Sequence, residues 1–225
     1  MAAYNLIVTK SHITKKAEAD FPTRWGHFRI FGFEGSFEEQ PDSESERSQL
    51  AREGAIERRK ESAVALVMGD IHSQPPLVRI HSQCLTGDVF GSRRCDCRQQ
   101  LELALQMISQ AGSGVLIYEE QEGRGIGLMA KLQAYELQDN GLDTVEANEK
   151  LGLKADYRQY SLPVEILKAL GIQSIRLLSN NPEKVKAVED AGIRVAERVS
   201  AEVEAYPTSE AYLKTKRDKM GHIFG

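Results

Sequence analysis

RQQLELALQMISQAGSGVLIY, residues 98–118, combines a helix and a strand in one short stretch and so indicates the class of fold. Its apolar side chains recur at the spacing of one helix face, at Leu101, Ala104, Leu105 and Ile108. Gly112 stands where a glycine commonly ends a helix. The apolar run GVLIY, residues 114–118, follows at once and is typical of a short buried strand. A helix that leads directly into a buried strand is the repeating unit of an α/β protein.

The same alternation continues toward the C-terminus. Helices are expected over residues 126–139, 162–170 and 181–192. Asn181 and Pro182 supply an N-cap and a first-turn proline for the last of these helices. Short apolar strands are expected at SIRLL (174–178) and IRVAERV (193–199). The pattern predicts a layered α/β/α fold around a mixed sheet.

The part of the chain before this region is rich in strand signals. FPTRWGHFRIFGF, residues 21–33, mixes aromatic and β-branched residues around two glycines. Residues 63–69 and 77–81 are apolar runs typical of buried strands. We therefore expect a β-rich N-terminal segment ahead of the α/β part. Residues 1–20 are expected to form an extension, and residues 21–225 a single domain.

A charged segment interrupts the β-rich part. Residues 34–62, EGSFEEQPDSESERSQLAREGAIERRKES, contain few large apolar side chains. Such a stretch cannot bury enough surface to offset the entropy of ordering. We expect an exposed insertion here, with a short helix near residues 45–60.

Composition and charge exclude several classes of protein. The chain has 225 residues and a formal net charge of −4, whereas non-specific nucleic-acid binders are usually basic. No stretch approaches the ~20 apolar residues of a membrane span. The N-terminus MAAYNLIVTKSHITKK lacks the apolar core and cleavage site of a signal peptide. We therefore expect a cytoplasmic protein that binds neither nucleic acid nor membrane.

The three cysteines of the chain lie close together, with the spacing Cys84-x10-Cys95-x-Cys97. An odd number in so tight a cluster argues against a disulfide framework, and thiolates suit zinc. Structural zinc normally has four protein ligands, whereas catalytic zinc has three and a water. His81 is the nearest rival fourth ligand, and His72 and His222 are more remote. The spacing leaves catalytic zinc, structural zinc and reduced core cysteines as alternatives.

A glycine-rich stretch follows the strand at 114–118. In EGRGIG, residues 122–127, glycines allow backbone amides to approach a phosphate or a planar base at the start of a helix. The stretch is neither a Walker A loop nor a good dinucleotide fingerprint. A tight strand-to-helix turn without a ligand explains it equally well.

Two further polar segments are candidates for substrate contacts. Asp156 and Arg158 lie in the loop LGLKADYRQY, where a surface ion pair is the ordinary interpretation. Ser179 and Lys184 flank Asn181 at the start of a predicted helix. That arrangement is explained either by helix capping or by a phosphate contact.

Several of these stretches together resemble the GTP cyclohydrolase II family. HSQCLTGDVFGSRRCDCRQQL, residues 81–101, is similar to the zinc segment of that family. The other similar stretches are FPTRWGHFRIFGFE (21–34), QEGRGIGL (121–128), KLQAYELQDNGLDTVEANEKLG (131–152), ADYR (155–158), LLSNNPEKV (177–185) and TKRDKMGH (215–222). The resemblance covers nearly the whole chain except the extension and the charged insertion.

The resemblance implies an activity and its cofactors. It implies that the chain opens the imidazole ring of GTP, releases formate and pyrophosphate, and acts at the head of riboflavin biosynthesis. It implies one catalytic Zn²⁺ per chain, bound by Cys84, Cys95 and Cys97, and Mg²⁺ with the triphosphate. It also implies a homodimer. The synthase domain that is often fused to this family has no counterpart in the sequence.

The resemblance also assigns roles to individual residues. It implies nucleotide contacts from Arg79, Ile80, His81, Ser82, Gln83, Gln100, Glu122, Gly123, Arg124, Thr144, Ser179 and Lys184. Tyr135 matches a tyrosine near the guanine, Asp156 a proton acceptor, and Arg158 a proposed nucleophile toward the α-phosphorus. Because the pKa of arginine exceeds ~12, electrostatic stabilisation is the alternative role for Arg158.

Two positions depart from the family pattern. Gln83 stands where the family usually has Glu, and Ser179 where it usually has Thr. Serine keeps the hydroxyl, but glutamine removes a charge beside Cys84. Two other functions also stay open: a paralogue that opens the ring of another purine nucleotide or stops before losing formate, and a non-catalytic zinc-stabilised nucleotide-binding protein.

Overall fold

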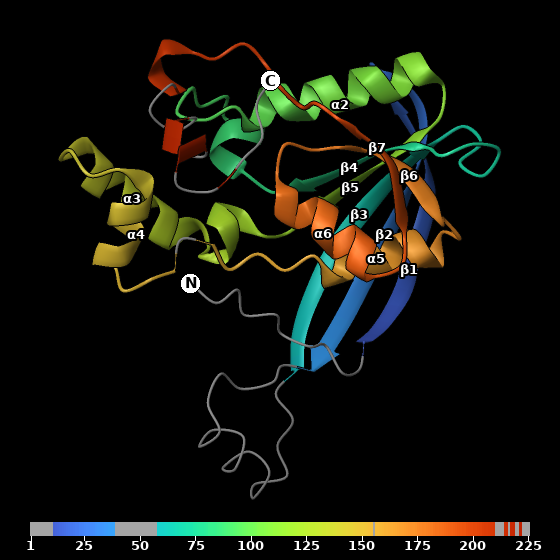
Figure 1. Ribbon diagram of the computed structural model, residues 1–225, viewed down its shortest axis with the longest axis horizontal. Helices are drawn as coiled ribbons and strands as arrows, with labels where there is room; N and C mark the ends of the chain where they lie inside the picture. The colour runs from blue at the N-terminus through green and yellow to red at the C-terminus, as the bar shows by residue number, and fades with distance from the viewer. Residues whose placement is uncertain are drawn as a thin grey trace, which may run out of the picture.

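The chain folds around one mixed β-sheet (Figure 1). The computed structural model describes residues 11–38, 58–154, 156–209, 214–215, 217–218 and 221. Within these residues the sheet has seven strands, in the order β1-β2-β3-β5-β4-β6-β7. The strands are β1 (Ser11–Thr23), β2 (Gly26–Glu38), β3 (Arg58–Met68), β4 (Leu77–Ser82), β5 (Gly114–Glu119), β6 (Ser174–Leu178) and β7 (Arg194–Val199).

The sheet has an antiparallel part and a parallel part. β1, β2, β3 and β5 pair antiparallel in succession. β5, β4, β6 and β7 pair parallel. Parallel neighbours need long crossover connections, and the helices of the second half of the chain supply them.

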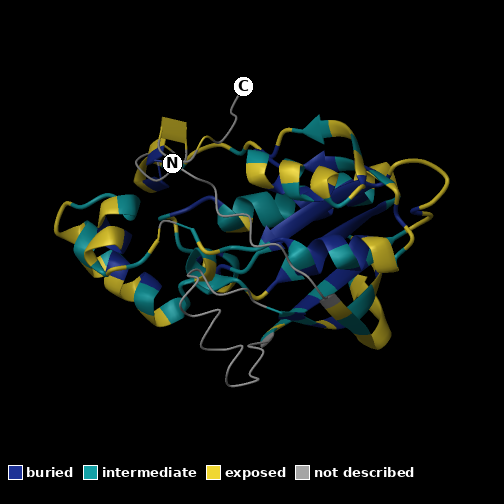
Figure 2. Ribbon diagram, turned by 60° about the horizontal axis from the view of Figure 1, so that its bottom comes forward, coloured by how far each residue is buried: buried dark blue, intermediate teal, exposed yellow. Residues whose placement is uncertain are grey.

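Helices cover both faces of the sheet. The α-helices are α2 (Cys97–Ala111), α3 (Leu128–Asp139), α4 (Thr144–Lys150), α5 (Ser161–Ala169) and α6 (Pro182–Asp190). Of these, α2 covers one face, and α5 and α6 cover the other. Ile108 of α2 packs with Leu116 of β5 in one core. Leu162 of α5 and Val188 of α6 pack with Ile117 in the core on the opposite face. Figure 2 shows the strands buried between these helices, and the predicted α/β/α layering around a mixed sheet is confirmed.

α3 and α4 lie outside both helical layers, beyond the carboxyl ends of β4 and β5 (Figure 1). α3 begins at Leu128, two residues later than predicted, because Glu122–Gly125 form a separate helical turn, η2. The sequence analysis did not predict α4. Its start has a capping box in which Asp143 and Glu146 each accept hydrogen bonds from the other's backbone.

The antiparallel strands extend into segments that the sequence analysis had treated as peripheral. Ser11–Thr23 form β1, so part of the expected extension pairs along the sheet. Both ends of the charged segment also lie in the sheet, since β2 runs to Glu38 and β3 starts at Arg58. Residues 58–60 of the predicted helix are therefore strand, and the rest of that helix lies outside the described residues.

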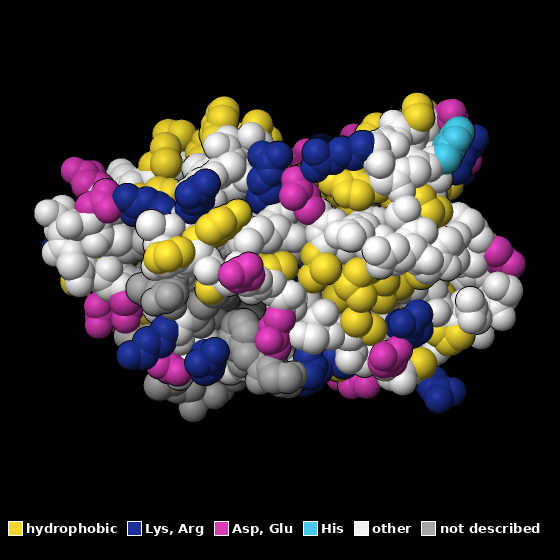
Figure 3. All heavy atoms as spheres, turned by 90° about the horizontal axis from the view of Figure 1, so that it is seen from above, with side chains coloured by type: hydrophobic (Ala, Val, Ile, Leu, Met, Phe, Trp, Pro, Cys, Tyr) yellow, Lys and Arg dark blue, Asp and Glu magenta, His cyan; other side chains and the backbone are white. Residues whose placement is uncertain are grey.

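The surface agrees with the low net charge. Basic and acidic side chains are interspersed on the face shown in Figure 3. Among the described residues, no helix is long and apolar enough to cross a membrane.

Candidate active site

The site lies at β4, where successive parallel strands are added first on one side of this strand and then on the other. The chain passes from β4 through α2 to β5 on one side of β4, and then through α3, α4 and α5 to β6 on the other side. In open α/β sheets this switch leaves a crevice at the carboxyl ends of the strands. Two adjoining cavities of about 100 Å³ and about 70 Å³ occupy it. Both are lined by Ser82, Cys97, Arg124 and Arg158, which makes them two ends of one site.

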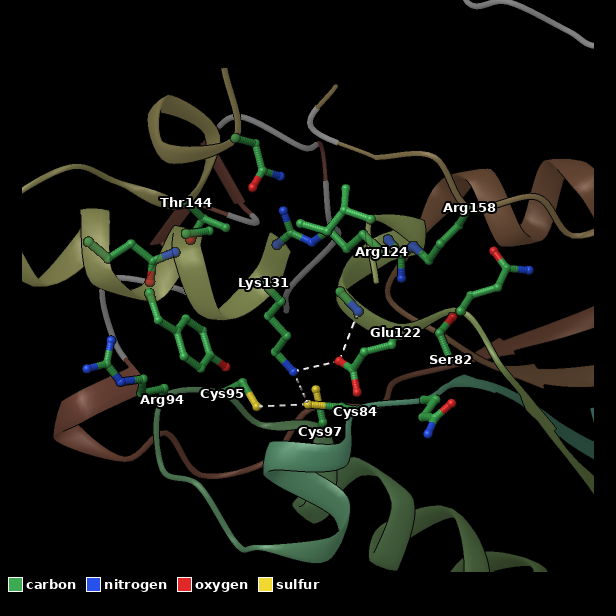
Figure 4. Close-up of a pocket in the computed structure, with 18 residues that line it drawn as sticks. Ser82, Cys84, Arg94, Cys95, Cys97, Glu122, Arg124, Lys131, Thr144 and Arg158 are labelled. Atoms are coloured by element: carbon green, nitrogen blue, oxygen red, sulfur yellow. Dashed lines mark hydrogen bonds and ion pairs between the residues drawn. The ribbon is translucent and has the colours of Figure 1, made fainter. Parts of the chain in front are cut away.

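The three cysteines meet in the larger cavity (Figure 4). Cys84 follows β4 directly, whereas Cys95 and Cys97 lie at the start of α2. Their sulfur atoms all lie within 4.8 Å of one another, and the Cys84 and Cys95 sulfurs are 3.7 Å apart. Gly87 lies so close that a Cβ there would be 3.1 Å from both of these sulfurs. Three converging soft donors fit a zinc ion.

None of the described histidines joins this cluster. His81 is buried, stacks on Tyr118 with ring centroids 5.5 Å apart, and has its Nε2 atom 3.3 Å from both carboxylate oxygens of Asp88. His72 precedes β4 and is therefore at the opposite end of that strand. His222 lies outside the described residues. Within the described part of the chain the cluster thus has three protein ligands, the number typical of catalytic zinc.

The three thiols of the cluster differ in pKa. Hydrogen bonds from Cys95 and Cys97 lower the pKa of Cys84, and the Lys131 ammonium lowers it further. Hydrogen bonding to Cys84 raises the pKa of Cys95 to about 11 and also raises the pKa of Cys97. Metal binding requires thiolates and would release the protons that the thiols still carry.

A lysine contacts the cluster directly. Lys131 of α3 is buried and donates to the Cys84 sulfur at 3.1 Å and to Glu122 Oε1 at 2.7 Å. The other carboxylate oxygen of Glu122 accepts from the backbone N–H of Leu85 at 2.6 Å. Burial opposes the charge of Lys131, but the Cys84 thiolate and Glu122 outweigh it and raise the pKa of Lys131. Tyr135, one helical turn later, lines the same cavity, and its hydroxyl is 3.3 Å from Thr86 Oγ1.

The loop between β5 and α3 has an unusual backbone. Gly123, Arg124, Gly125 and Gly127 all have φ between 61° and 87°, a left-handed conformation that glycine tolerates best. Arg124 adopts it without being glycine, and such strain is concentrated at functional sites. The Arg124 carbonyl accepts from the backbone N–H of Tyr157 at 2.9 Å. The loop therefore brings the segment around residue 157 against the site.

The smaller cavity is lined by cations. Arg79, Arg124, Arg158 and Lys184 contribute side chains to it, and the described lining residues include no Asp or Glu. Arg79 is buried and donates to the Leu178 carbonyl at 3.0 Å and to Gln100 Oε1 at 2.6 Å.

Lys184 comes from the first turn of α6, at the same cavity. It is buried and donates to the Ile80 carbonyl at 2.9 Å. Burial lowers the pKa of Lys184 to about 7, and Glu119 partly opposes this effect. The N-terminus of α6 carries the N-cap residue Asn181, and the hydroxyl of Ser179 accepts from the Asn181 N–H at 3.1 Å. A helix N-terminus beside several cations is suited to binding an anion.

Asp156 and Arg158 form a mostly buried ion pair rather than the surface pair that was the ordinary interpretation. Their side chains are 16% and 12% exposed. Arg158 Nε lies 3.0 Å from both carboxylate oxygens, and the backbone N–H of Arg158 donates to Asp156 Oδ1 at 2.9 Å. Burial raises the pKa of Asp156, but Arg158 outweighs it and holds this pKa below its ordinary value. The pair orients the Arg158 guanidinium toward the cavities.

Comparison with known proteins identifies the family. A family profile described as GTP cyclohydrolase II matches residues 14–200. The chain belongs to the GTP cyclohydrolase II family. GTP cyclohydrolase-2 of Buchnera aphidicola subsp. Acyrthosiphon pisum (strain APS) is 51% identical over 207 residues, which cover 92% of this chain and 96% of that protein.

Longer relatives contain a second part. Riboflavin biosynthesis protein RibBA of Chlorobium phaeovibrioides (strain DSM 265 / 1930) is 47% identical over 212 residues, covering 94% of this chain and 47% of that protein. RibBA of Bacillus cereus (strain ATCC 14579) is 46% identical over 224 residues, covering 97% and 51%. The chain thus spans about half the length of the RibBA relatives and nearly the full length of the Buchnera protein.

The structure brings together most of the residues that the family resemblance singled out. The larger cavity contains Ser82, Gln83, Cys84, Cys95, Cys97, Glu122, Gly123, Arg124, Tyr135, Thr144 and Arg158. The smaller one contains Arg79, His81, Ser82, Cys97, Gln100, Arg124, Arg158, Ser179 and Lys184. Two residues differ in placement: the Ile80 side chain packs in the core, and Asp156 contacts Arg158 without lining either cavity.

Sequence analysis missed two residues with several contacts in the site. Lys131 lies in LMAKLQAY, where a single lysine looks like an ordinary surface position. Its one signal is the four-residue spacing from Tyr135, which places both on one helix face. Asp88 accepts from the Cys84 N–H at 3.0 Å and from the Tyr118 hydroxyl at 2.9 Å. The Tyr118 contact joins positions that are adjacent only in the folded chain.

Proposed function

We propose that this chain hydrolyses GTP to formate, pyrophosphate and 2,5-diamino-6-(5-phosphoribosylamino)pyrimidin-4(3H)-one, the first step of riboflavin biosynthesis. The observation that carries the proposal is the continuity of the two cavities. A cluster of three cysteines lies at one end, and a cavity lined by four basic side chains lies at the other. A nucleotide has the same polarity, with a base at one end and phosphates at the other. Membership of the family supports GTP as the substrate.

At the base end, Cys84, Cys95 and Cys97 would bind Zn²⁺. When bound, zinc supplies Lewis acidity and a water nucleophile at neutral pH. The hydroxyl of Tyr135, beside Thr86 at the edge of the cavity, is suited to orient the guanine. Thr144, the first residue of α4, lines the wall near Tyr135 and adds a hydroxyl to the same region.

At the phosphate end, the chain itself supplies positive charge for the triphosphate, with Mg²⁺ as the expected partner of the phosphates. Positioning and charge neutralisation are the main requirements of phosphoryl chemistry. Arg158 is held by Asp156, which stays ionised because its pKa lies below the ordinary value. A carboxylate paired with Arg158 favours the protonated guanidinium. We therefore propose that Arg158 stabilises the negative charge that develops on the phosphates in the transition state. A covalent adduct between the nucleotide and Arg158 would show instead that this residue attacks the phosphate.

The proposal also includes assembly and location. We propose a homodimer, which light scattering on the purified protein would test, and activity in the cytoplasm. These two statements rest on the family resemblance alone.

Product analysis tests the function. Purified protein loaded with zinc should convert GTP, in the presence of Mg²⁺, to one formate and one pyrophosphate per GTP consumed. Retention of the formyl group on a ring-opened nucleotide would instead identify a paralogue that stops before deformylation. Tight GTP binding without any product would identify a nucleotide-binding protein. Either result would contradict the proposal.

A further inference from the structure

A buried cation contacts the cysteine cluster. Lys131 Nζ lies 3.1 Å from the Cys84 sulfur, and the lysine is only 9% exposed (Figure 4). Among the described residues, it is the one Lys or Arg with a recorded hydrogen bond to a cysteine sulfur. Burying an ammonium is costly unless it is paired. The lysine is therefore held at the cluster by specific contacts.

The charge of the cluster explains why a cation is useful there. Three thiolates carry one more negative charge than the +2 of a zinc ion, so the occupied centre would be anionic. An anionic centre is a poorer Lewis acid than a site with three neutral histidines. The ammonium of Lys131 offsets that excess charge, because it donates directly to one of the three sulfurs. Charge-assisted hydrogen bonds of this kind are stronger than neutral ones.

The neighbours of Lys131 connect this cation to the rest of the site. Glu122 accepts from Lys131 at 2.7 Å and from the backbone N–H groups of Leu85 and Gly123 at 2.6 and 2.9 Å. Glu122 thus joins the loop that carries Cys84 to the loop after β5. Tyr135 places its ring 5.7 Å from the Lys131 ammonium. Side chains from two other elements, and one from α3 itself, therefore converge on one ammonium group.

We propose that Lys131 is a positioning residue for the metal centre: it withdraws electron density from the Cys84 thiolate and holds Glu122 in place beside it. The inference rests on the proposed zinc site and adds a residue to it. Groups that orient or polarise metal ligands commonly change metal affinity or activity by roughly 10–100-fold when they are removed. Lys131 acts through Cys84 and Glu122.

Cobalt spectroscopy on the full chain tests the electronic part of this role. Metal-free protein reconstituted with Co²⁺ alone should show thiolate-to-cobalt charge-transfer bands. In Lys131→Leu these bands should move to longer wavelength, because the sulfur lone pairs lose the stabilisation of the ammonium. Lys131→Arg keeps the charge and should restore most of the wild-type position. Lys168→Leu is a matched control, since Lys168 is half-exposed and pairs with Glu165 on α5.

Turnover of the zinc-loaded variants gives a second readout. In Lys131→Leu, kcat for formate release should fall roughly 10–100-fold, and Lys131→Arg should recover part of it. If Lys131→Leu does not fold, Lys131→Gln replaces it, because glutamine retains a donor but no charge, and the same band shift is expected. Charge-transfer bands at the wild-type position in a folded Lys131→Leu or Lys131→Gln protein would overturn the inference.

Different results would contradict the zinc site and the role of Lys131. A wild-type protein that binds neither zinc nor cobalt at the cysteines would overturn both the zinc site and the role of Lys131. A wild-type protein that binds metal and opens GTP, with a Lys131→Leu variant that matches it in bands and kcat, would overturn the role of Lys131 alone.

Discussion

At the scale of single residues, the smaller cavity contains a lysine, Lys184, with a pKa close to neutrality. Burial lowers the pKa of Lys184 to about 7, whereas its ordinary value is 10.5. Between these two values the unfolded chain binds the proton and the folded chain does not. By linkage, this residue makes the folded state more stable as pH rises through that window. The depressed pKa also makes the residue sensitive to a bound anion.

Binding of a triphosphate should therefore be coupled to proton uptake. Phosphate charge beside Lys184 favours the ammonium and raises its pKa. At pH 8 we expect uptake of up to one proton per site when a non-hydrolysable GTP analogue binds, and Lys184→Met should remove this uptake. Titration calorimetry in two buffers with different ionisation enthalpies measures it. Equal proton uptake by the wild type and Lys184→Met would assign the coupling to another group.

Arg158 offers a second prediction at this scale. Because its guanidinium is held in the site by Asp156, Arg158→Ala should slow pyrophosphate release roughly a hundredfold or more, as removal of one electrostatic contact typically does. A quench during turnover of GTP labelled at the α-phosphate should leave no label on the wild-type protein. Trapped label that Arg158→Ala abolishes would show covalent attack, and near-normal pyrophosphate release from Arg158→Ala would exclude both roles.

Some residues of the site could be predicted from the sequence and others could not. The clustering of the three cysteines indicated a metal site because thiolates have few other reasons to cluster in a chain of this kind. The Asp156–Arg158 pair was ambiguous, because exposed and buried ion pairs look alike in sequence. Lys131 could not be recognised, since its importance comes from a sulfur atom 47 positions away.

At the scale of elements, the helical turn η1 (Leu85–Val89) sets the spacing of the cysteines. The backbone N–H of Asp88 donates to the Cys84 carbonyl at 2.7 Å, and its carboxylate accepts from the Cys84 N–H at 3.0 Å. Gly87, buried within this turn, faces the cluster. A Cβ on Gly87 would lie 3.1 Å from the sulfurs of Cys84 and Cys95. A side chain at position 87 would therefore crowd these two sulfurs.

Gly87→Ala should consequently weaken zinc binding. Overpacking of this kind costs about 1–3 kcal/mol, and we expect zinc affinity to fall roughly tenfold or more, because 1.4 kcal/mol corresponds to a factor of ten. Competition with a chromogenic chelator measures the affinity. Gly32→Ala in β2 is a suitable control, since its added Cβ would meet atoms no closer than 4.0 Å. Unchanged zinc affinity in Gly87→Ala would show that the turn is not a constraint on the cluster.

Elements with strong local signals were predicted, and those without were not. α2 and β5 followed from apolar spacing and from Gly112, which has the expected left-handed conformation at the helix end. α4 has seven residues and depends mainly on its capping box, so its periodicity is too short to detect. The predicted start of α3 was early because periodicity does not report the left-handed backbone at residues 123–127.

At the scale of the whole molecule, strands β2 and β3 bring the two ends of the charged segment together. Glu38 and Arg58 are direct partners in the antiparallel pairing of these strands. The two chain ends therefore lie beside each other, and a short turn can join them.

Replacement of residues 40–56 by a short Gly-Ser turn should leave the site intact. We expect zinc content and GTP turnover within about twofold of the wild type, because the segment lacks the apolar side chains that contribute to a core. Metal analysis and formate release measure both quantities. Loss of the fold on deletion would show instead that the segment packs against the core or against a partner subunit.

The class of fold was predictable, whereas the order of its strands was not. Alternating helices and short apolar strands indicated layers around a mixed sheet, but no local pattern places β5 between β3 and β4. That order depends on pairings between distant segments, such as Val64 with Tyr118. The same strand order places β4 where the connections change sides, which creates the crevice that forms the site. The position of the site is thus a property of the whole sheet.

The central claim is that the three cysteines hold a zinc ion required for opening the guanine ring. Cys95→Ser tests it most directly when zinc content and formate release are measured on the same preparations of the variant and the wild type. The account predicts about one zinc per chain and formate from GTP for the wild type, because three thiolates form the site. It predicts loss of both for Cys95→Ser. A folded, zinc-free Cys95→Ser protein that releases formate at the wild-type rate would contradict it.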